Sequence, residues 1–209
     1  MVYVYENLGS YSEALYESHL SSLPEWRKAY ALKYKKSEDR KRSVLAFVLL
    51  REAVKREFGE EIQEFEYNQF GKPFLKGNSL HFSLSHCKSA VACAVSESEI
   101  GIDLETVREF DEKLSARVLT GTELKLMESA KDPKELFFKF WTQKEAAAKF
   151  EGVGLGLVLQ KLELSNYLLH SEKREDFVLS VCYGKTAQPK AFQPKAPSVI
   201  TVDNDRFRR

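Results

Sequence analysis

Apolar residues recur at helical spacing after Ser37 and predict the first long element of the chain. Ser37 is followed by Glu38 and Asp39, and a hydroxyl residue before an acidic first turn is typical of a helix N-cap. The apolar face then continues towards Phe58 and Gly59 through Val44, Leu45, Val48, Leu49 and Ala53. We therefore expect one amphipathic helix that begins after Ser37 and ends near Gly59.

Three short strands follow this helix, as the alternation of apolar and polar residues indicates. Residues 80–84 place Leu80, Phe82 and Leu84 on one face and polar side chains on the other, which is typical of a half-buried strand. Residues 91–95 and 100–105 form two more short strands, separated by compact polar turns. The first half of the chain is predicted to be a helix followed by an antiparallel meander.

The second half repeats this order of helices before strands. Helical spacing covers residues 114–130 and 133–150, whereas residues 157–164 and 177–183 are predicted to be strands. Residues 199–202 are the candidate for a last edge strand, after a tail segment that contains three prolines. Helices and strands segregated in this way predict an α+β fold of mixed helices and small antiparallel sheets.

Composition excludes several function classes. The chain of 209 residues carries 32 Lys and Arg against 31 Asp and Glu, and a net charge of +1 gives no global field for nucleic acid or a membrane surface. The N-terminal residues lack a basic lead and an apolar segment, and no apolar run reaches membrane-spanning length. The cysteines form no CxxC pair and suit a reducing compartment: Cys87, Cys93 and Cys182. We expect a cytoplasmic protein that binds neither nucleic acid nor membranes.

Three carboxylates fall where a hydrophobic core is expected. In the strand at 100–105, Asp103 and Glu105 share one face, opposite the apolar residues that alternate with them. Glu145 continues a helical stripe formed by Phe137, Trp141 and Ala148. Clustered carboxylates repel one another unless a proton, a basic side chain or a metal relieves them, and oxygen ligands suit Mg²⁺ beside a phosphate. Alternatively, Asp103 and Glu105 are solvated and Glu145 pairs with Lys149.

Basic and hydroxyl residues near these acids are candidates for holding a phosphate group. Lys144 and Lys149 lie in the same predicted helix as the third acid and could offer positive charge to a phosphoryl group, although helical lysines are more often solvated. Ser85 and His86 end the predicted strand at a tight turn. There both side chains can face a ligand, or the histidine can cap backbone groups instead.

Two further candidates lie upstream of the acids. A basic run within residues 33–42 surrounds the start of the first long helix, where Ser43 also lies, and a helix N-terminus is suited to an anion. Lys72 lies in the rigid Gly71-Lys72-Pro73 turn, and its alternative role is that of a surface loop residue. Basic runs are usually solvated faces, so neither feature identifies a binding site alone.

Four segments carry a pattern together that none of them carries alone: Phe70-Gly71-Lys72-Pro73, Phe82-Ser83-Leu84-Ser85-His86, Gly101-Ile102-Asp103-Leu104-Glu105 and Trp141-Thr142-Gln143-Lys144-Glu145-Ala146-Ala147-Ala148-Lys149. In order and spacing they resemble the Sfp-type 4'-phosphopantetheinyl transferases, over residues 36–164. The resemblance implies a pseudo-dimer of two similar halves, each a helix packed on a small antiparallel sheet, with the active site in the cleft between them. Residues 1–99 would hold the nucleotide end of coenzyme A, and residues 100–209 would carry the metal site and the carrier-docking surface.

The resemblance also implies an activity. The enzyme would transfer the 4'-phosphopantetheine group from coenzyme A to a serine of an acyl or peptidyl carrier protein, and 3',5'-ADP would leave. Mg²⁺ as the cofactor would be held by Asp103, Glu105 and Glu145. Glu145 would also accept the serine proton, and Lys149 would steady the pyrophosphate. The remaining contacts to coenzyme A would come from Ser43, Lys72, Ser85, His86 and Lys144. Arg27 and Lys28 lie near positions that are basic in relatives.

Two residues depart from the family pattern. Ser83 stands where relatives commonly have Asn, and Cys87 stands where a small hydroxyl residue is usual. Both residues are small, and the three acids are unchanged.

Two other functions stay open at this point: a non-catalytic coenzyme A or nucleotide-binding module, and a metal-dependent phosphohydrolase that uses the same acids with water. In each case we expect a monomer, because the pseudo-dimer contains both halves in one chain.

Overall fold

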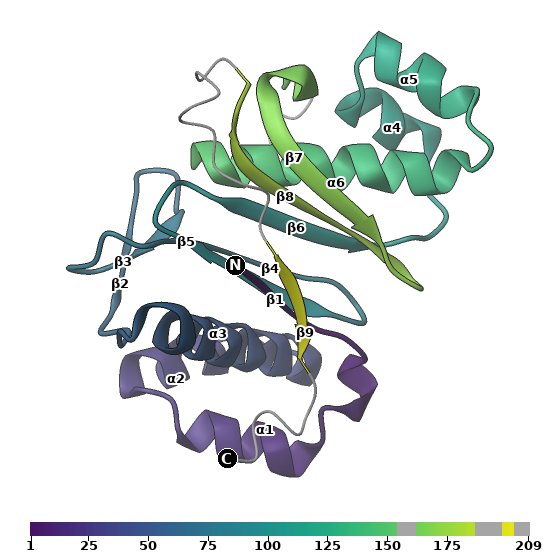
Figure 1. Cartoon of the computed structure of the whole chain (residues 1–209). Helices are drawn as coiled ribbons and strands as arrows, with labels where there is room; N and C mark the ends of the chain where they lie inside the picture. Colours follow the sequence, from purple (N-terminus) through teal and green to yellow (C-terminus); the bar gives the residue numbers. More distant parts are fainter. Residues whose placement is uncertain (154–161, 187–197, 203–209) are drawn as a thin grey trace.

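The computed structural model describes residues 1–153, 162–186 and 198–202 of the chain, and the strands in these residues form three sheets (Figure 1). The four-stranded sheet has the order β4-β5-β1-β9 and is built from β1 (Val2–Tyr5), β4 (His81–His86), β5 (Val91–Ser96) and β9 (Val199–Val202). The three-stranded sheet has the order β6-β8-β7 and is built from β6 (Gly101–Thr106), β7 (Tyr167–Lys173) and β8 (Phe177–Lys185). A small hairpin pairs β2 (Phe65–Tyr67) with β3 (Pro73–Leu75). The predicted α+β class is confirmed.

The first long helix, α3 (Ser37–Phe58), packs between the four-stranded sheet and two shorter helices, α1 (Glu13–Ser21) and α2 (Glu25–Leu32) (Figure 1). Every side chain from Val44 to Leu50 is buried, because the sheet covers one side of α3 and the short helices cover the other. The predicted helix is confirmed, but its cap lies one residue earlier than predicted. Lys36 is the N-cap, without a side-chain capping bond, and Ser37 is the first helical residue.

The second long helix, α6 (Pro133–Glu151), covers the three-stranded sheet, and the two sheets face each other between α3 and α6 (Figure 1). The contact between the sheets is apolar and fully desolvated, with Val4 and Ala92 from one sheet and Ile102, Leu104 and Val181 from the other. The order of layers is therefore helix, sheet, sheet, helix, and β6 lies beside β4 where the two sheets meet.

The predicted meander is wrong at its third strand. β6 pairs antiparallel with β8, not with β5, so residues 100–105 belong to the second sheet. Gly101 explains why this strand lies under α6: a Cβ at this position would lie 2.0 Å from the carbonyl oxygen of Ala146. Only glycine lets the backbone of α6 pack directly on β6.

The single helix predicted for residues 114–130 is also wrong, because the structure has two helices there. α4 (Glu112–Val118) ends at Leu119, which has extended backbone angles. Thr120 then caps α5 (Gly121–Glu128) in a capping box with Glu123, so the chain starts a new helix instead of continuing the old one. Two short 3₁₀ turns complete the described elements, η1 (Leu8–Ser10) and η3 (Leu164–Asn166).

The remaining strand predictions have mixed outcomes. β8 confirms the strand predicted at 177–183, and β9 confirms the edge strand at 199–202, which pairs parallel with β1. The strand predicted at 157–164 falls mainly outside the described residues, and β1, β2, β3 and β7 were not predicted. Among the described residues, no helix combines the length and the apolar character needed to span a membrane.

Candidate active site

A cavity of about 490 Å³ opens where β4 and β6 meet, and it is lined by residues from both sheets and from α2, α3 and α6. Seven of the predicted site residues line it: Ser43, Ser85, His86, Asp103, Glu105, Glu145 and Lys149. Trp141, Glu145 and Lys149 are four residues apart along α6, so they project from one face of the helix into the cavity. The fold thus brings together side chains that lie more than 100 residues apart in the sequence.

Asp103 has one satisfied and one unsatisfied carboxylate oxygen. Its side chain is buried, and Oδ1 accepts hydrogen bonds from Ser85 Oγ at 2.7 Å and from Lys149 Nζ at 2.7 Å. Oδ2 is also buried, yet it has no hydrogen-bond partner among the described residues. A buried carboxylate oxygen without a donor is costly, so this atom is a candidate for contact with a cation or another ligand.

Glu145 is a second buried acid on the same cavity. The pKa of Glu145 is raised to about 7, chiefly by burial and also by the negative charge of Asp103, whereas Lys149 opposes this shift. Glu105 adds a smaller repulsive contribution to the pKa of Glu145 and is itself paired with Arg108 at 2.8 Å. The acids are close enough to repel one another, although no three Asp, Glu, His or Cys side chains of the described residues form a ready-made metal cluster.

Lys149 links the two sheets at the base of the cavity. Its Nζ donates to Asp103 on β6, to Ser85 Oγ on β4 at 3.1 Å and to the Leu84 carbonyl at 3.4 Å. The carboxylate of Asp103 and the hydroxyl of Ser85 therefore share one ammonium group. This partner set neutralises part of the acidic charge and fixes β4 beside β6.

The opposite end of the cavity is basic and aromatic. Arg27 is 4 % exposed, and its guanidinium donates to the carbonyl oxygen of Ser43 at 2.7 Å and to Ser43 Oγ at 2.9 Å. It also lies over the ring of Tyr30, 4.7 Å from the ring centroid. Burial lowers the pKa of His86, and the positive charges of Arg42 and Lys149 lower it further. A neutral histidine can still donate one ring N–H to a ligand, while Arg42 and Lys149 supply the positive charge near it.

Relatives of known function share much of this chain. The 4'-phosphopantetheinyl transferase Sfp of Bacillus subtilis (strain 168) is 30% identical over 158 residues, which is 71% of this chain and 69% of Sfp. The chain belongs to the 4'-phosphopantetheinyl transferase superfamily. The sequence profile of that superfamily matches residues 99–186, which include the three acids and Lys149.

Two further relatives match shorter segments of this chain. The 4'-phosphopantetheinyl transferase gsp of Aneurinibacillus migulanus is 31% identical over 128 residues, 59% of this chain and 54% of that protein. The 4'-phosphopantetheinyl transferase HetI of a Nostoc species is 36% identical over 111 residues, 49% of this chain and 46% of that protein. The chain therefore spans about half the length of these two relatives.

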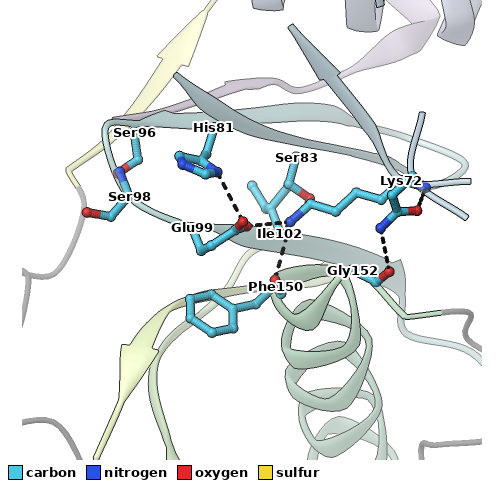
Figure 2. A network of polar contacts seen from close by, with 10 residues as sticks. Lys72, His81, Ser83, Ser96, Ser98, Glu99, Ile102, Phe150 and Gly152 are labelled. Atoms are coloured by element: carbon cyan, nitrogen blue, oxygen red, sulfur yellow. Dashed lines mark hydrogen bonds and ion pairs between the residues drawn. The ribbon is translucent and has the colours of Figure 1, made fainter. Parts of the chain in front are cut away.

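Lys144 and Lys72 do not line the main cavity. Lys144 has no exposed side-chain surface, and its Nζ pairs with Glu123 of α5 at 2.8 Å. The Nζ of Lys72 lies 2.6 Å from Glu99 and 3.2 Å from the carbonyl oxygen of Phe150 (Figure 2). Lys72 lines a smaller neighbouring cavity instead, which Lys149 also lines. The neighbours of Lys72 in the turn, Gly71 and Pro73, do line the main cavity.

The aromatic wall of the cavity was not predicted. Three tyrosines contribute to it from α2, from the segment after α2 and from β2, namely Tyr30, Tyr34 and Tyr67. Arg27 was noted in the sequence only for its position near residues that are basic in relatives. Arg27 and Tyr30 are three residues apart, which is neighbour spacing on a helix, but α2 has only eight residues and gave little periodic signal.

Proposed function

We propose that this protein transfers the 4'-phosphopantetheine group of coenzyme A to a serine hydroxyl of an acyl or peptidyl carrier protein. The serine oxygen forms a new bond to the phosphorus that carries pantetheine, the bond from that phosphorus to the leaving 3',5'-ADP breaks, and the serine proton passes to a base. The observation that carries the proposal is the single cavity that combines buried acids at Asp103 and Glu145 with cations at Arg27 and Lys149.

We further propose a divalent cation, Mg²⁺, held by Asp103, Glu105 and Glu145. The unpartnered, buried Oδ2 of Asp103 and the mutual repulsion of the three acids support this assignment. When bound, such an ion neutralises charge on a pyrophosphate.

The side chains themselves have distinct proposed roles. Glu145, with a pKa near 7, is suited to accept the serine proton at neutral pH. Lys149 is placed to hold a pyrophosphate oxygen, since its ammonium lies on the cavity wall between the two sheets. Ser43, Ser85 and His86 are proposed to hold the nucleotide end of coenzyme A, together with Arg27.

The proposal extends to the organisation of the molecule. We regard residues 1–99 and 100–209 as two similar halves of a pseudo-dimer that acts as a monomer, because the first half places α3 on β4, β5 and β1 and the second places α6 on β6, β8 and β7. β9 is the exception, since this strand of the second half pairs parallel with β1 of the first. The carrier protein would dock near α4 and α5, where Leu126 is 53% exposed while Leu119 and Met127 are core residues. The free, buried cysteines support a cytoplasmic location: Cys87, Cys93 and Cys182.

Mass spectrometry of a carrier protein tests the activity directly. The protein is mixed with coenzyme A, Mg²⁺ and a panel of apo carriers, and we expect one carrier to gain the mass of a single phosphopantetheine. An unchanged mass for every carrier, with coenzyme A still bound, would indicate a binding module instead. Rapid hydrolysis of coenzyme A without a carrier would indicate a phosphohydrolase.

A further inference from the structure

The side chain of Lys72 is held at the end of α6 by two separate segments of the chain. Its ammonium donates to Glu99, which precedes β6, and to the carbonyl oxygen of Phe150 in the last turn of α6 (Figure 2). The carboxylate of Glu99 also pairs with His81, the first residue of β4, whose Nδ1 lies 3.2 Å from Glu99 Oε1. The lysine that the family resemblance assigns to coenzyme A therefore already has protein partners outside the main cavity.

Asn68 makes a second contact to the same helix end. Its Nδ2 donates to the carbonyl oxygen of Gly152 at 2.9 Å, and its Oδ1 accepts from the backbone N–H groups of Phe70 and Lys72, each at 2.9 Å. One asparagine thus closes the turn at residues 68–72 and attaches that turn to α6. The last carbonyl groups of a helix have no partner within the helix, and a cation there also complements the helix dipole.

Gly152 fits this arrangement at the end of α6. It has φ of 69°, and a Cβ there would lie 3.1 Å from both Asn68 Nδ2 and Lys72 Cδ. The close approach of Lys72 and Asn68 to the helix end therefore depends on a residue without a side chain. Lys149 lies three residues before Gly152, so the position of its ammonium in the cavity depends on how this end of α6 is held.

We propose that Lys72 and Asn68 are positioning residues, the α6 clamp, and that Lys72 is not a ligand of the coenzyme A phosphates. The clamp holds the last turn of α6 against the turn that contains Gly71 and Pro73. It thereby fixes the distance between Lys149 and the part of the cavity wall that Gly71 and Pro73 form. The catalytic part of this inference rests on the proposed function, whereas the structural part stands on the contacts alone.

The kinetic test compares Lys72→Met with Glu99→Gln, because Glu99 touches Lys72 but does not line the main cavity. We expect Lys72→Met to lower kcat/KM for carrier modification by about 10-fold or more, since small misplacements of reacting groups are costly. Glu99 is half exposed, so Glu99→Gln is expected to give a smaller loss of about 2- to 5-fold. The double variant is expected to be no worse than Lys72→Met. The matched control is Lys76→Met, whose lysine pairs with Glu64 at the surface.

The two roles of Lys72 predict different results for Glu99→Gln. If Lys72 were a phosphate ligand, removal of its carboxylate partner would free the lysine and leave kcat/KM unchanged or raised. If it bound the 3'-phosphate in particular, the defect of Lys72→Met would also disappear with 3'-dephospho-coenzyme A as donor. Either result would overturn the clamp. The clamp predicts that Lys72→Met loses the same factor in kcat/KM with coenzyme A and with 3'-dephospho-coenzyme A.

Hydrogen exchange supplies a readout that needs no enzymatic activity. We expect faster amide exchange in the last turn of α6 and in residues 68–76 for Lys72→Met and for Asn68→Ala, and unchanged exchange for Lys76→Met. Unchanged exchange in both clamp variants would reject the clamp even if the wild-type protein is an active transferase. Faster exchange in a wild-type protein that modifies no carrier would keep the clamp and reject the proposed function.

Discussion

The two long helices α3 and α6 occupy equivalent outer layers, yet they differ in what they bury. In α3 the central buried residues are apolar, and Ser43 is its one hydroxyl on the described cavity wall. In α6 the buried face includes Thr142, Lys144 and Glu145. Buried polar groups reduce stability unless they are paired. The buried face of α6 therefore stabilises the fold less than the apolar face of α3 does, but it carries groups that can act on a ligand. The comparison separates a helix that supports the fold from a helix that carries chemistry.

The largest expected effect concerns the buried ion pair on the far side of α6. Lys144→Met leaves Glu123 buried without its cation, and we expect a loss of about 3–5 kcal/mol in the free energy of unfolding, measured with urea. The kcat of the folded fraction should stay near that of the wild type, because Lys144 lies outside the cavity. The comparison variant is Lys149→Met, for which we expect loss of activity with a smaller loss of stability. If Lys144→Met lost activity but not stability, Lys144 would belong to the catalytic group instead.

The next effect tests how closely α6 packs on β6. Gly101→Ala would place a Cβ 2.0 Å from the Ala146 carbonyl oxygen, so helix and strand must separate. We expect a loss of about 3 kcal/mol in the free energy of unfolding, at the upper end of overpacking effects, together with reduced transfer activity. Gly121→Ala is the matched control, because a Cβ there meets no atom within 4 Å. Equal stability of the two variants would show that the helix and strand tolerate separation.

Glu145→Gln tests the chemical role of α6 without changing the size of the side chain. We expect kcat to fall by about 100-fold, which is typical for loss of a general base. Stability should be unchanged or slightly higher, because Gln removes a carboxylate that is buried beside Asp103. Glu135→Gln, at a half-buried acid in the first turn of α6 that does not line the main cavity, serves as the control. Near-normal turnover of Glu145→Gln would remove its proposed role as base.

The smallest expected effect concerns His19 of α1, a helix that packs against α3. Its titration should change the free energy of unfolding but not the transfer activity. Burial lowers the pKa of His19 to about 4, with a contribution from Arg51, and Tyr11 hydrogen-bonds to its Nδ1 at 2.8 Å. The pKa of His19 in the folded protein lies below its value of about 6.5 in the unfolded chain. The stability that neutral His19 contributes is therefore fully present above pH 6.5 and is lost as the pH falls towards 4. We expect wild type to lose about 2 kcal/mol more than His19→Gln between pH 7 and pH 5 in urea titrations. If the free energies of unfolding of wild type and His19→Gln changed in parallel with pH, the lowered pKa of His19 would be contradicted.

The sequence predicted the elements whose signal is local. The apolar spacing in α3 and α6 and the alternation in β4, β5 and β6 give these elements directly. The partner of β6 could not be predicted in the same way, because β8 lies about 70 residues later and alternation does not specify which strand lies alongside. The break at Leu119 was missed because the helical spacing continues across it, although Thr120 and Glu123 form a capping-box signature that was available in the sequence.

The candidate site likewise has features that the sequence could predict and features that it could not. Lys144 and Lys149 are five residues apart, or roughly 140° around a helix, so the two lysines could not face the same ligand. That argument was available from the sequence, and the structure agrees with it by burying Lys144 against Glu123. The partners of Lys72 were not predictable, because Glu99 and the end of α6 approach it only through the packing of the two sheets.

The pairing of β9 with β1 bears on how the protein is synthesised. Val2 is opposite Val199 and Tyr5 is opposite Val202, so β1 is covered on one side by a segment that is synthesised almost 200 residues later. Until that segment leaves the ribosome, β1 presents unpaired N–H and C=O groups along an otherwise complete and apolar strand. The nascent chain therefore carries an open sheet edge until residues 199–202 have been made, a period in which this edge can pair with strands of other chains.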